Sequence, residues 1–166
     1  SKAETEALGI RPGDFISLDP RTVVTPSGFI KSRHLDDKAS SAVLLTLARE
    51  VAEGRVTLGR QATVVFTVCE EVGHGASPLY KMDIDDLVAV DMGCVGDDLA
   101  CKENMVSICA KDSAGPYDYD LTNELIAIAK EKALPYAVDI YPRYSSDTAT
   151  ALRAGLDARY ALCGQG

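Results

Sequence analysis

The sequence contains no tryptophan and only three phenylalanines, and aromatic residues make up 6% of its 166 residues. It is also short of positive charge, since 17 lysines and arginines face 25 aspartates and glutamates, for a formal net charge of −8. A nucleic-acid-binding protein needs a basic surface that neutralises phosphates, and an anionic membrane surface attracts the same kind of charge. The composition therefore argues against nucleic-acid and membrane partners.

Long apolar runs and regularly spaced cysteines are missing as well. No hydrophobic stretch approaches the roughly 20 residues that cross a bilayer. The five cysteines include no Cys-x-x-Cys pair, which argues against a thiolate zinc site and against a disulfide framework. Unpaired thiols are typical of a reducing compartment such as the cytoplasm. With 46% hydrophobic and 25% charged residues, the chain has the composition of a folded soluble domain.

The pattern along the chain changes near residue 33. Residues 1–8 predict the end of a helix, closed by Gly9, and residues 10–31 predict short β segments, the first at residues 14–18. From Arg33 onward helical and strand patterns alternate, which predicts an α/β domain with a mostly parallel or mixed sheet flanked by helices. The expected domains are therefore residues 1–32 and residues 33–166.

Helices and strands of the second region are assigned from apolar periodicity and from turn residues. Residues 62–68 (ATVVFTV) form a continuous β-branched run, typical of a strand that is buried on both faces. The other predicted strands are residues 87–91, 106–110, 136–141 and 158–162, and the predicted helices are residues 39–53, 121–133 and 147–154, the last with Asp147 as its N-cap.

Acidic residues occur where an open α/β sheet places its ligands. Asp36 and Asp37 precede the first helix, Glu70 and Glu71 follow the predicted strand 62–68, and Asp91 ends the next strand. Ligands of such sheets bind beyond the carboxyl ends of the strands, where crowded carboxylates repel one another unless cations neutralise them. A metal site is the simplest interpretation, and the alternative is solvated surface or helix N-terminal charge.

Five short motifs, taken in order, resemble the M42 family of dinuclear metalloaminopeptidases. They are residues 32–38 (SRHLDDK), 68–73 (VCEEVG), 90–92 (VDM), 111–117 (KDSAGPY) and 145–149 (SSDTA). The resemblance implies that residues 1–32 are the end of a small β-rich inserted domain and that residues 33–166 belong to the catalytic α/β domain. It also implies two divalent metal ions, zinc first, with cobalt or manganese as alternatives.

The resemblance also implies site roles. Asp36 would bridge the two ions, Glu71 and Asp91 would each bind one of them, and Glu70 would be the general base that deprotonates the attacking water. Asp37 is expected to lie outside the ligand set, as a residue that supports the ligands or caps the helix.

Substrate contacts are expected from His74, Ser146 and Asp147. His74 follows the paired glutamates in a glycine-rich turn, whereas His34 is expected to make a structural hydrogen bond. Cys69 is expected to be a buried inert thiol, with a nucleophile paired with His74 as the alternative.

The function implied by the resemblance is a metal-dependent aminopeptidase that hydrolyses peptides from a free N-terminus and assembles as a homo-oligomer. Family members also use one histidine before the first motif and one after the last, and neither His34 nor His74 matches these positions. We therefore expect the chain to be part of a longer protein. Two alternatives remain open: a catalytically incomplete subunit of the same fold, and another di-zinc hydrolase such as a carboxypeptidase or deacylase.

Overall fold

A computed structural model describes residues 1–166, which divide into the units Ser1–Leu35 and Asp36–Gly166. The first unit contains helix α1 (Lys2–Ala7) and the antiparallel strands β1 (Val23–Val24) and β2 (Ile30–Lys31). Ser1 caps α1 through a capping box with Glu4. The predicted helix at the N-terminus is therefore confirmed.

No strand forms at residues 14–18, so that prediction is wrong. The Phe15 side chain is fully exposed and that of Ile16 is 81% exposed. A segment with alternating apolar and polar residues forms a strand only when a second strand pairs with it through hydrogen bonds. The strand pairing of this unit is the short β1–β2 pair.

The second unit is built on a mixed sheet, as predicted. Its strands are β3 (Asp86–Val90), β4 (Val106–Asp112), β5 (Gly115–Pro116), β6 (Tyr136–Ile140) and β7 (Arg159–Gln165). Strand β7 lies between β3, to which it is parallel, and β4, to which it is antiparallel. Strand β4 also pairs with β6 in parallel and with β5 in antiparallel orientation.

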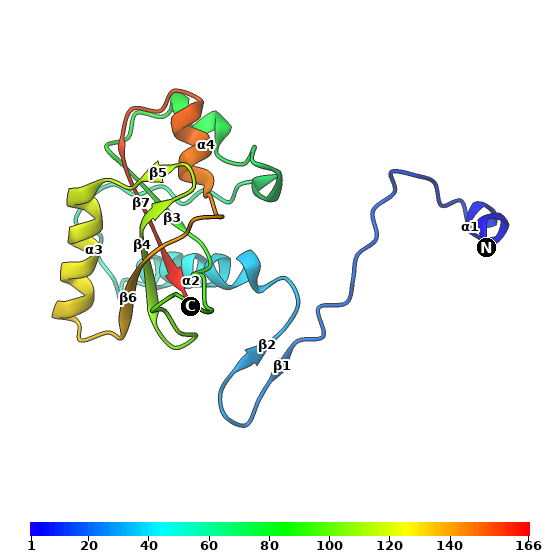
Figure 1. Cartoon of the computed structure of the whole chain (residues 1–166), viewed down its shortest axis with the longest axis horizontal. Helices are drawn as coiled ribbons and strands as arrows, with labels where there is room; N and C mark the ends of the chain where they lie inside the picture. Colours follow the sequence, from blue (N-terminus) through cyan, green and yellow to red (C-terminus); the bar gives the residue numbers. More distant parts are fainter. The chain divides into compact units, whose positions relative to one another are not determined.

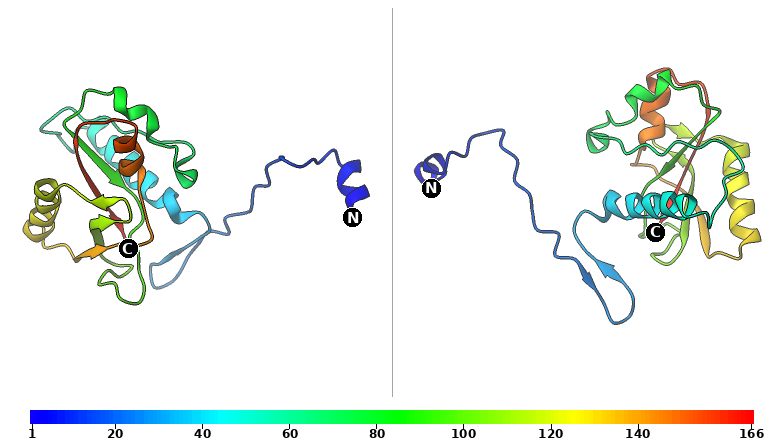
Figure 2. Two further views of the ribbon diagram at one scale, coloured as in Figure 1. Left: turned by 45° about the horizontal axis from the view of Figure 1, so that its top comes forward. Right: turned by 180° about the vertical axis from the view of Figure 1, so that it is seen from behind.

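Helices surround this sheet, and the sheet forms the middle of the unit (Figures 1 and 2). They are α2 (Leu35–Ala52), α3 (Tyr119–Glu131), α4 (Asp147–Arg153) and the 3₁₀ turns η1 (Glu70–Val72) and η2 (Ser77–Lys81). Helix α3 packs on β4 and β7, and α4 packs on β3, β7 and η2. None of these helices is both long and apolar enough to cross a membrane.

Two buried clusters hold the second unit together. Tyr117, Tyr141, Cys109 and Leu162 join β4 and β7 to the segments that follow β5 and β6. Ala76, Ala151 and Leu156 join η2 to α4, and Ala76 and Ala151 have no exposed surface. Small buried residues allow such close packing. Together the two clusters hold α4 and the ends of the strands in place.

The strand predicted at residues 62–68 is absent. Val64, Phe66 and Val68 are 40%, 50% and 79% exposed, although the run has the composition of a doubly buried strand. The composition of this run is apolar and β-forming, but a strand needs a partner strand, and none of the seven strands of these 166 residues pairs with the run. The neighbouring helix α2 shares this exposure, with Val43 and Leu45 at 57% and 59%.

An exposed apolar run of this kind predicts self-association of the isolated 166-residue chain. Phe66→Ser should lower the fraction of dimers and larger species in sedimentation velocity, because it removes the largest apolar side chain of the run. Tyr119→Ser is the matched control, since Tyr119 is an 80% exposed aromatic residue on α3, outside the run. A chain that stays monomeric at all concentrations would contradict this prediction.

Candidate active site

Four acidic side chains line one cavity of about 520 Å³ in the second unit: Asp36, Glu70, Glu71 and Asp91. They come from the start of α2, from η1 and from the residue that follows β3. A volume of this size is typical of a small-molecule or peptide-end pocket. The remaining lining residues are Gly73, Met92, Cys94, Leu99, Tyr141, Pro142, Arg143, Tyr144, Ser145, Ser146 and Thr150, among which Arg143 is the single cation.

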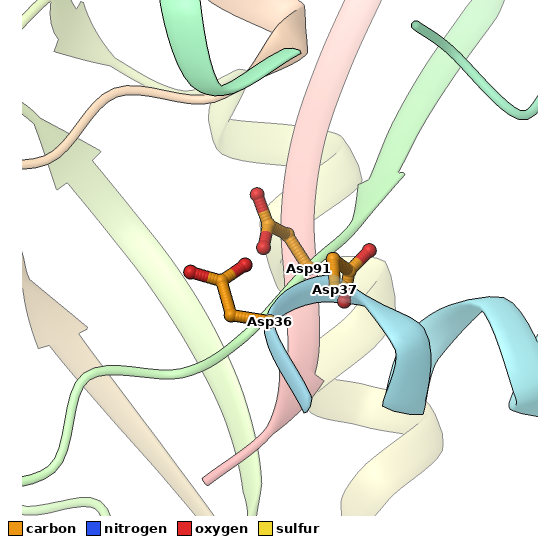
Figure 3. Close-up of side chains that lie close together, drawn as sticks. All are labelled: Asp36, Asp37 and Asp91. Carbon is orange, nitrogen blue, oxygen red and sulfur yellow. The ribbon is translucent and has the colours of Figure 1, made fainter. Parts of the chain in front are cut away.

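The tightest acidic group is Asp36, Asp37 and Asp91, which offer one oxygen each within 4.8 Å of one another. Figure 3 shows Asp36 and Asp37 at the start of α2 and Asp91 beside them on the chain that leaves β3. Oxygens that surround one divalent cation lie about 2.0–2.6 Å from it, so ligands on opposite sides are about 4–5 Å apart. The spacing of these three carboxylates therefore fits a divalent cation.

Strand pairing fixes the position of Asp91. Its N–H donates to the Cys163 carbonyl at 3.1 Å, which continues the β3–β7 ladder by one residue. A Cβ at Gly164 would lie 1.5 Å from the Asp91 carbonyl oxygen, so only glycine allows this approach. The Asp91 carboxylate accepts from the Met92 N–H at 2.6 Å and is 9% exposed.

The start of α2 holds the other two aspartates. Asp36 (φ −84°, ψ 110°) and Asp37 (φ −115°, ψ 46°) have non-helical backbone angles, and the peptide bond between them is cis. The fully buried Ser40 donates to Gln165 Oε1 at 3.0 Å, which ties this end of α2 to β7. Asp37 Oδ1 is buried with no hydrogen-bond partner. An unpaired buried carboxylate oxygen beside two other carboxylates is available to bind a cation.

Glu70 and Glu71 lie on a tight turn and not on the end of a strand. Cys69 (φ 66°) and Gly73 (φ 73°) are both left-handed and enclose the 3₁₀ turn η1. The Gly73 N–H donates to the Glu70 carbonyl at 2.7 Å, and the His74 N–H donates to the Cys69 carbonyl at 3.1 Å. On such a turn consecutive side chains point in different directions, yet both glutamates line the cavity.

Crowding changes the acidity of these groups. Burial, and then the charge of Asp91, raises the pKa of Glu70 to about 7. Burial also raises the pKa of Asp37 to about 6 and, together with the charge of Glu71, raises the pKa of Asp36. Each carboxylate is harder to ionise because it is partly removed from water and because its neighbours carry the same charge, and a bound cation would favour the ionised form.

Of the three residues expected to contact substrate, one lines the cavity and two do not. Ser146 lines the cavity, but its buried hydroxyl is hydrogen-bonded to Tyr117 Oη at 2.9 Å and to Thr148 Oγ1 at 2.7 Å. His74 is exposed and is not among the lining residues. Asp147 is not among them either, because its carboxylate binds Thr67 and Ala76.

Two further expectations are corrected. Cys69 is exposed, because it lies in the left-handed bend before η1 and not inside a buried strand. Asp147 does not cap α4: the N-cap residue is Ser146, which makes no side-chain capping bond. All five cysteines are free thiols, as expected.

Two residues at the site were not among those expected to form it. Asp37 is expected to support the ligands or to cap the helix, and its oxygen belongs to the closest acidic group. Tyr144 lines the cavity with a buried hydroxyl that has no hydrogen-bond partner. Burial and the charge of Asp91 raise the pKa of this Tyr144 hydroxyl. No spacing rule distinguishes Tyr144 from the packing tyrosines around it.

Comparison with known proteins shows the family of this chain. The sequence model of the M42 glutamyl aminopeptidase family matches residues 1–166. The chain belongs to the M42 family. It is 44% identical over 165 residues to YhfE of Bacillus subtilis (strain 168), named a putative aminopeptidase, and the match covers 99% of this chain and 48% of YhfE. The M42 chain thus spans about half the length of this relative.

Solved structures show the same fold. The aminopeptidase APDkam598 of Desulfurococcus kamchatkensis superposes with a TM-score of 0.79 at 22% identity, over 99% of this chain and 48% of that one. The TET1 peptidase of Pyrococcus horikoshii, which can assemble into a tetrahedron or a large octahedral shell, gives a TM-score of 0.72 at 22% identity, over 99% of this chain and 49% of its own. The α/β fold expected of an M42 chain is therefore confirmed.

The raised acidities predict how the metal-free protein responds to pH. The pKa of Glu70 rises from 4.5 to about 7 on folding, so the native state keeps a proton that the unfolded state releases. This contribution to stability is complete below pH 4.5 and is lost as the pH passes about 7, and Asp37 acts in the same direction between 3.8 and about 6.

In chelator-treated protein the Tm should therefore fall between pH ~4 and ~7, and Glu70→Gln should make this fall smaller. Differential scanning calorimetry at several pH values measures both slopes. Glu103→Gln, a change at an exposed glutamate that does not line the cavity, should keep the original slope. An identical slope in the Glu70→Gln variant would show that burial and neighbouring charge do not raise the pKa of Glu70.

Proposed function

We propose that this chain forms the metal-binding part of an aminopeptidase that removes residues from the free N-terminus of peptides. The observation that carries the proposal is the gathering of Asp36, Glu70, Glu71 and Asp91 around one cavity in a member of the M42 family. Four acidic groups facing a single cationic lining residue leave an uncompensated negative charge, which divalent ions would neutralise.

In this proposal Asp36 would be shared by two divalent ions, zinc first, and Glu71 and Asp91 would each hold one of them. Asp37, with its unpaired Oδ1, is a further candidate ligand beside Asp36 and Asp91. When bound, the ions would supply polarisation of the peptide carbonyl and increased acidity of the attacking water. The two histidines implied by the family resemblance match neither His34 nor His74, so they would come from outside these 166 residues.

Glu70 would move the proton. As the general base, it would accept a proton from the attacking water and return it to the leaving amine. It lies on the same short turn as Glu71 and lines the same cavity. A general base must lie within hydrogen-bond reach of the attacking water, and the shared cavity with Glu71 supports such a position for Glu70.

Two wider features belong to the proposal. The Ser1–Leu35 unit, with its hairpin, would be the end of a small β-rich domain inserted in the catalytic domain, with the boundary three residues later than the sequence pattern placed it. The full-length protein would form a homo-oligomer and act in the cytoplasm, supported by the assembly of the P. horikoshii relative and by the free cysteines.

Substitution of the two adjacent glutamates tests the assigned roles in the full-length protein. Glu70→Gln should lower kcat by roughly 10²–10⁴ with metal content nearly unchanged, because only proton transfer is lost. Glu71→Ala should lose bound metal as well as turnover, measured by metal analysis of the purified variants. Glu103→Gln should change neither quantity.

The choice of substrate distinguishes the proposed activity from related hydrolases. An unblocked peptide should be shortened from its N-terminus, whereas the same peptide with an acetylated N-terminus should stay intact, as followed by mass spectrometry of the products. Release of C-terminal residues would indicate a carboxypeptidase, and no turnover of either peptide by the metal-loaded protein would refute the proposal.

A further inference from the structure

One carboxylate outside the cavity binds both ends of the segment that carries Glu70 and Glu71. Asp147 Oδ2 accepts from Thr67 Oγ1 at 2.5 Å, and Asp147 Oδ1 accepts from the Ala76 N–H at 2.8 Å. Thr67 lies three residues before Glu70, and Ala76 lies five residues after Glu71. The two hydrogen bonds therefore close residues 67–76 into a loop fastened to the first residue of α4.

Gly75 leaves the space that this arrangement needs. A Cβ at Gly75 would lie 2.5 Å from Asp147 Oδ1 and 2.9 Å from Thr67 Oγ1. Its backbone is not left-handed, so a side chain is excluded by the closeness of the carboxylate and not by conformation. The loop and α4 thus fit each other closely at this point.

Packing anchors the same contact. Ala76 has no exposed surface and packs with Ala151 of α4 and with Leu156, and η2 follows it directly. The amino-terminal end of the loop has no such anchor, since Val68 is 79% exposed and residues 62–68 form no strand. The bond from Thr67 to Asp147 is therefore the contact that holds this end.

The same geometry argues against a substrate contact for Asp147. Both of its oxygens accept hydrogen bonds from the protein, and it does not line the cavity, although Ser146 and Thr150 on either side do. We propose that Asp147 is a positioning residue: by binding Thr67 and the Ala76 N–H it fixes residues 67–76, and so the placement of the Glu70 and Glu71 carboxylates in the cavity. Its catalytic consequence rests on the proposed peptidase function, but its structural part does not.

Two substitutions of Asp147 separate positioning from charge. Asp147→Ala removes both hydrogen bonds, whereas Asp147→Asn keeps them: its carbonyl oxygen accepts from the Ala76 N–H, and its NH₂ donates to the Thr67 hydroxyl oxygen. In the full-length protein we expect amide hydrogen exchange in residues 67–76 to become about tenfold faster or more in the alanine variant and to stay near the original rate in the asparagine variant. We expect kcat to fall about 10–100-fold in the alanine variant, with KM nearly unchanged, and to be largely retained with asparagine.

Matched controls account for general effects at a helix start and at a glycine. Asp120→Ala removes an exposed acidic residue from the first turn of α3 and should leave exchange in residues 67–76 unchanged. Gly75→Ala should push the carboxylate away and reproduce the faster exchange, whereas Gly59→Ala, at a glycine with no atom within 4 Å of the added Cβ, should not. Thr67→Val gives a milder variant in case Asp147→Ala does not fold.

The outcomes distinguish the two proposals. Equal losses with alanine and asparagine, seen as a raised KM with unchanged exchange, would show that Asp147 binds substrate through its charge and would overturn the positioning role. Unchanged exchange and unchanged kcat in the alanine variant would overturn it as well. If the unsubstituted metal-loaded protein does not cleave peptides, the peptidase proposal fails, while the exchange rates still decide whether Asp147 holds the loop.

Discussion

Repulsion among carboxylates at one end of the sheet is the constraint on which the rest of this structure depends. Asp36, Asp37 and Asp91 bring oxygens within 4.8 Å, and Glu70 and Glu71 face the same cavity. Left alone, these charges would push α2, η1 and the end of β3 apart. The fold opposes this with contacts that are individually ordinary: the ladder bond from Asp91 to Cys163, the Ser40–Gln165 bond and the Asp147 contacts to Thr67 and Ala76. Protons, or cations when they are bound, supply the remaining compensation.

Much of this arrangement could be predicted from the sequence, because it depends on patterns among residues that are close together in the chain. Periodicity indicated α2, α3 and α4, and the apolar runs indicated β3, β4, β6 and β7, each within a few residues of its observed bounds. The rule that ligands gather beyond the carboxyl ends of strands placed Asp36, Glu70, Glu71 and Asp91 together, and all four line one cavity. These inferences need only the chain near each residue and the general geometry of an open sheet.

What could not be predicted depends on partners distant in the sequence. Residues 62–68 have strand composition, but whether a strand forms is decided by a neighbouring ladder that these residues cannot specify. Asp147 was predicted to cap its own helix, whereas its side chain binds groups 71 and 80 residues away. The unpaired oxygen of Asp37 and the buried hydroxyl of Tyr144 likewise result from tertiary packing. The spacing of residues along the sequence does not predict such packing.

The position of the paired glutamates explains why a contact from outside the cavity matters. A carboxylate at the end of a paired strand, such as that of Asp91, is held in position by the hydrogen bonds of the sheet. Glu70 and Glu71 have no such support, because the residues before them form no strand and the turn that carries them is closed only by its own short hydrogen bonds. In the proposed function Glu70 transfers a proton, and such a group must be held within about 0.5 Å of its working geometry, so rigidity has to come from elsewhere in the chain. Asp147 and Ala76 supply it from α4 and its packing, which makes Asp147 part of the site although its carboxylate does not line the cavity.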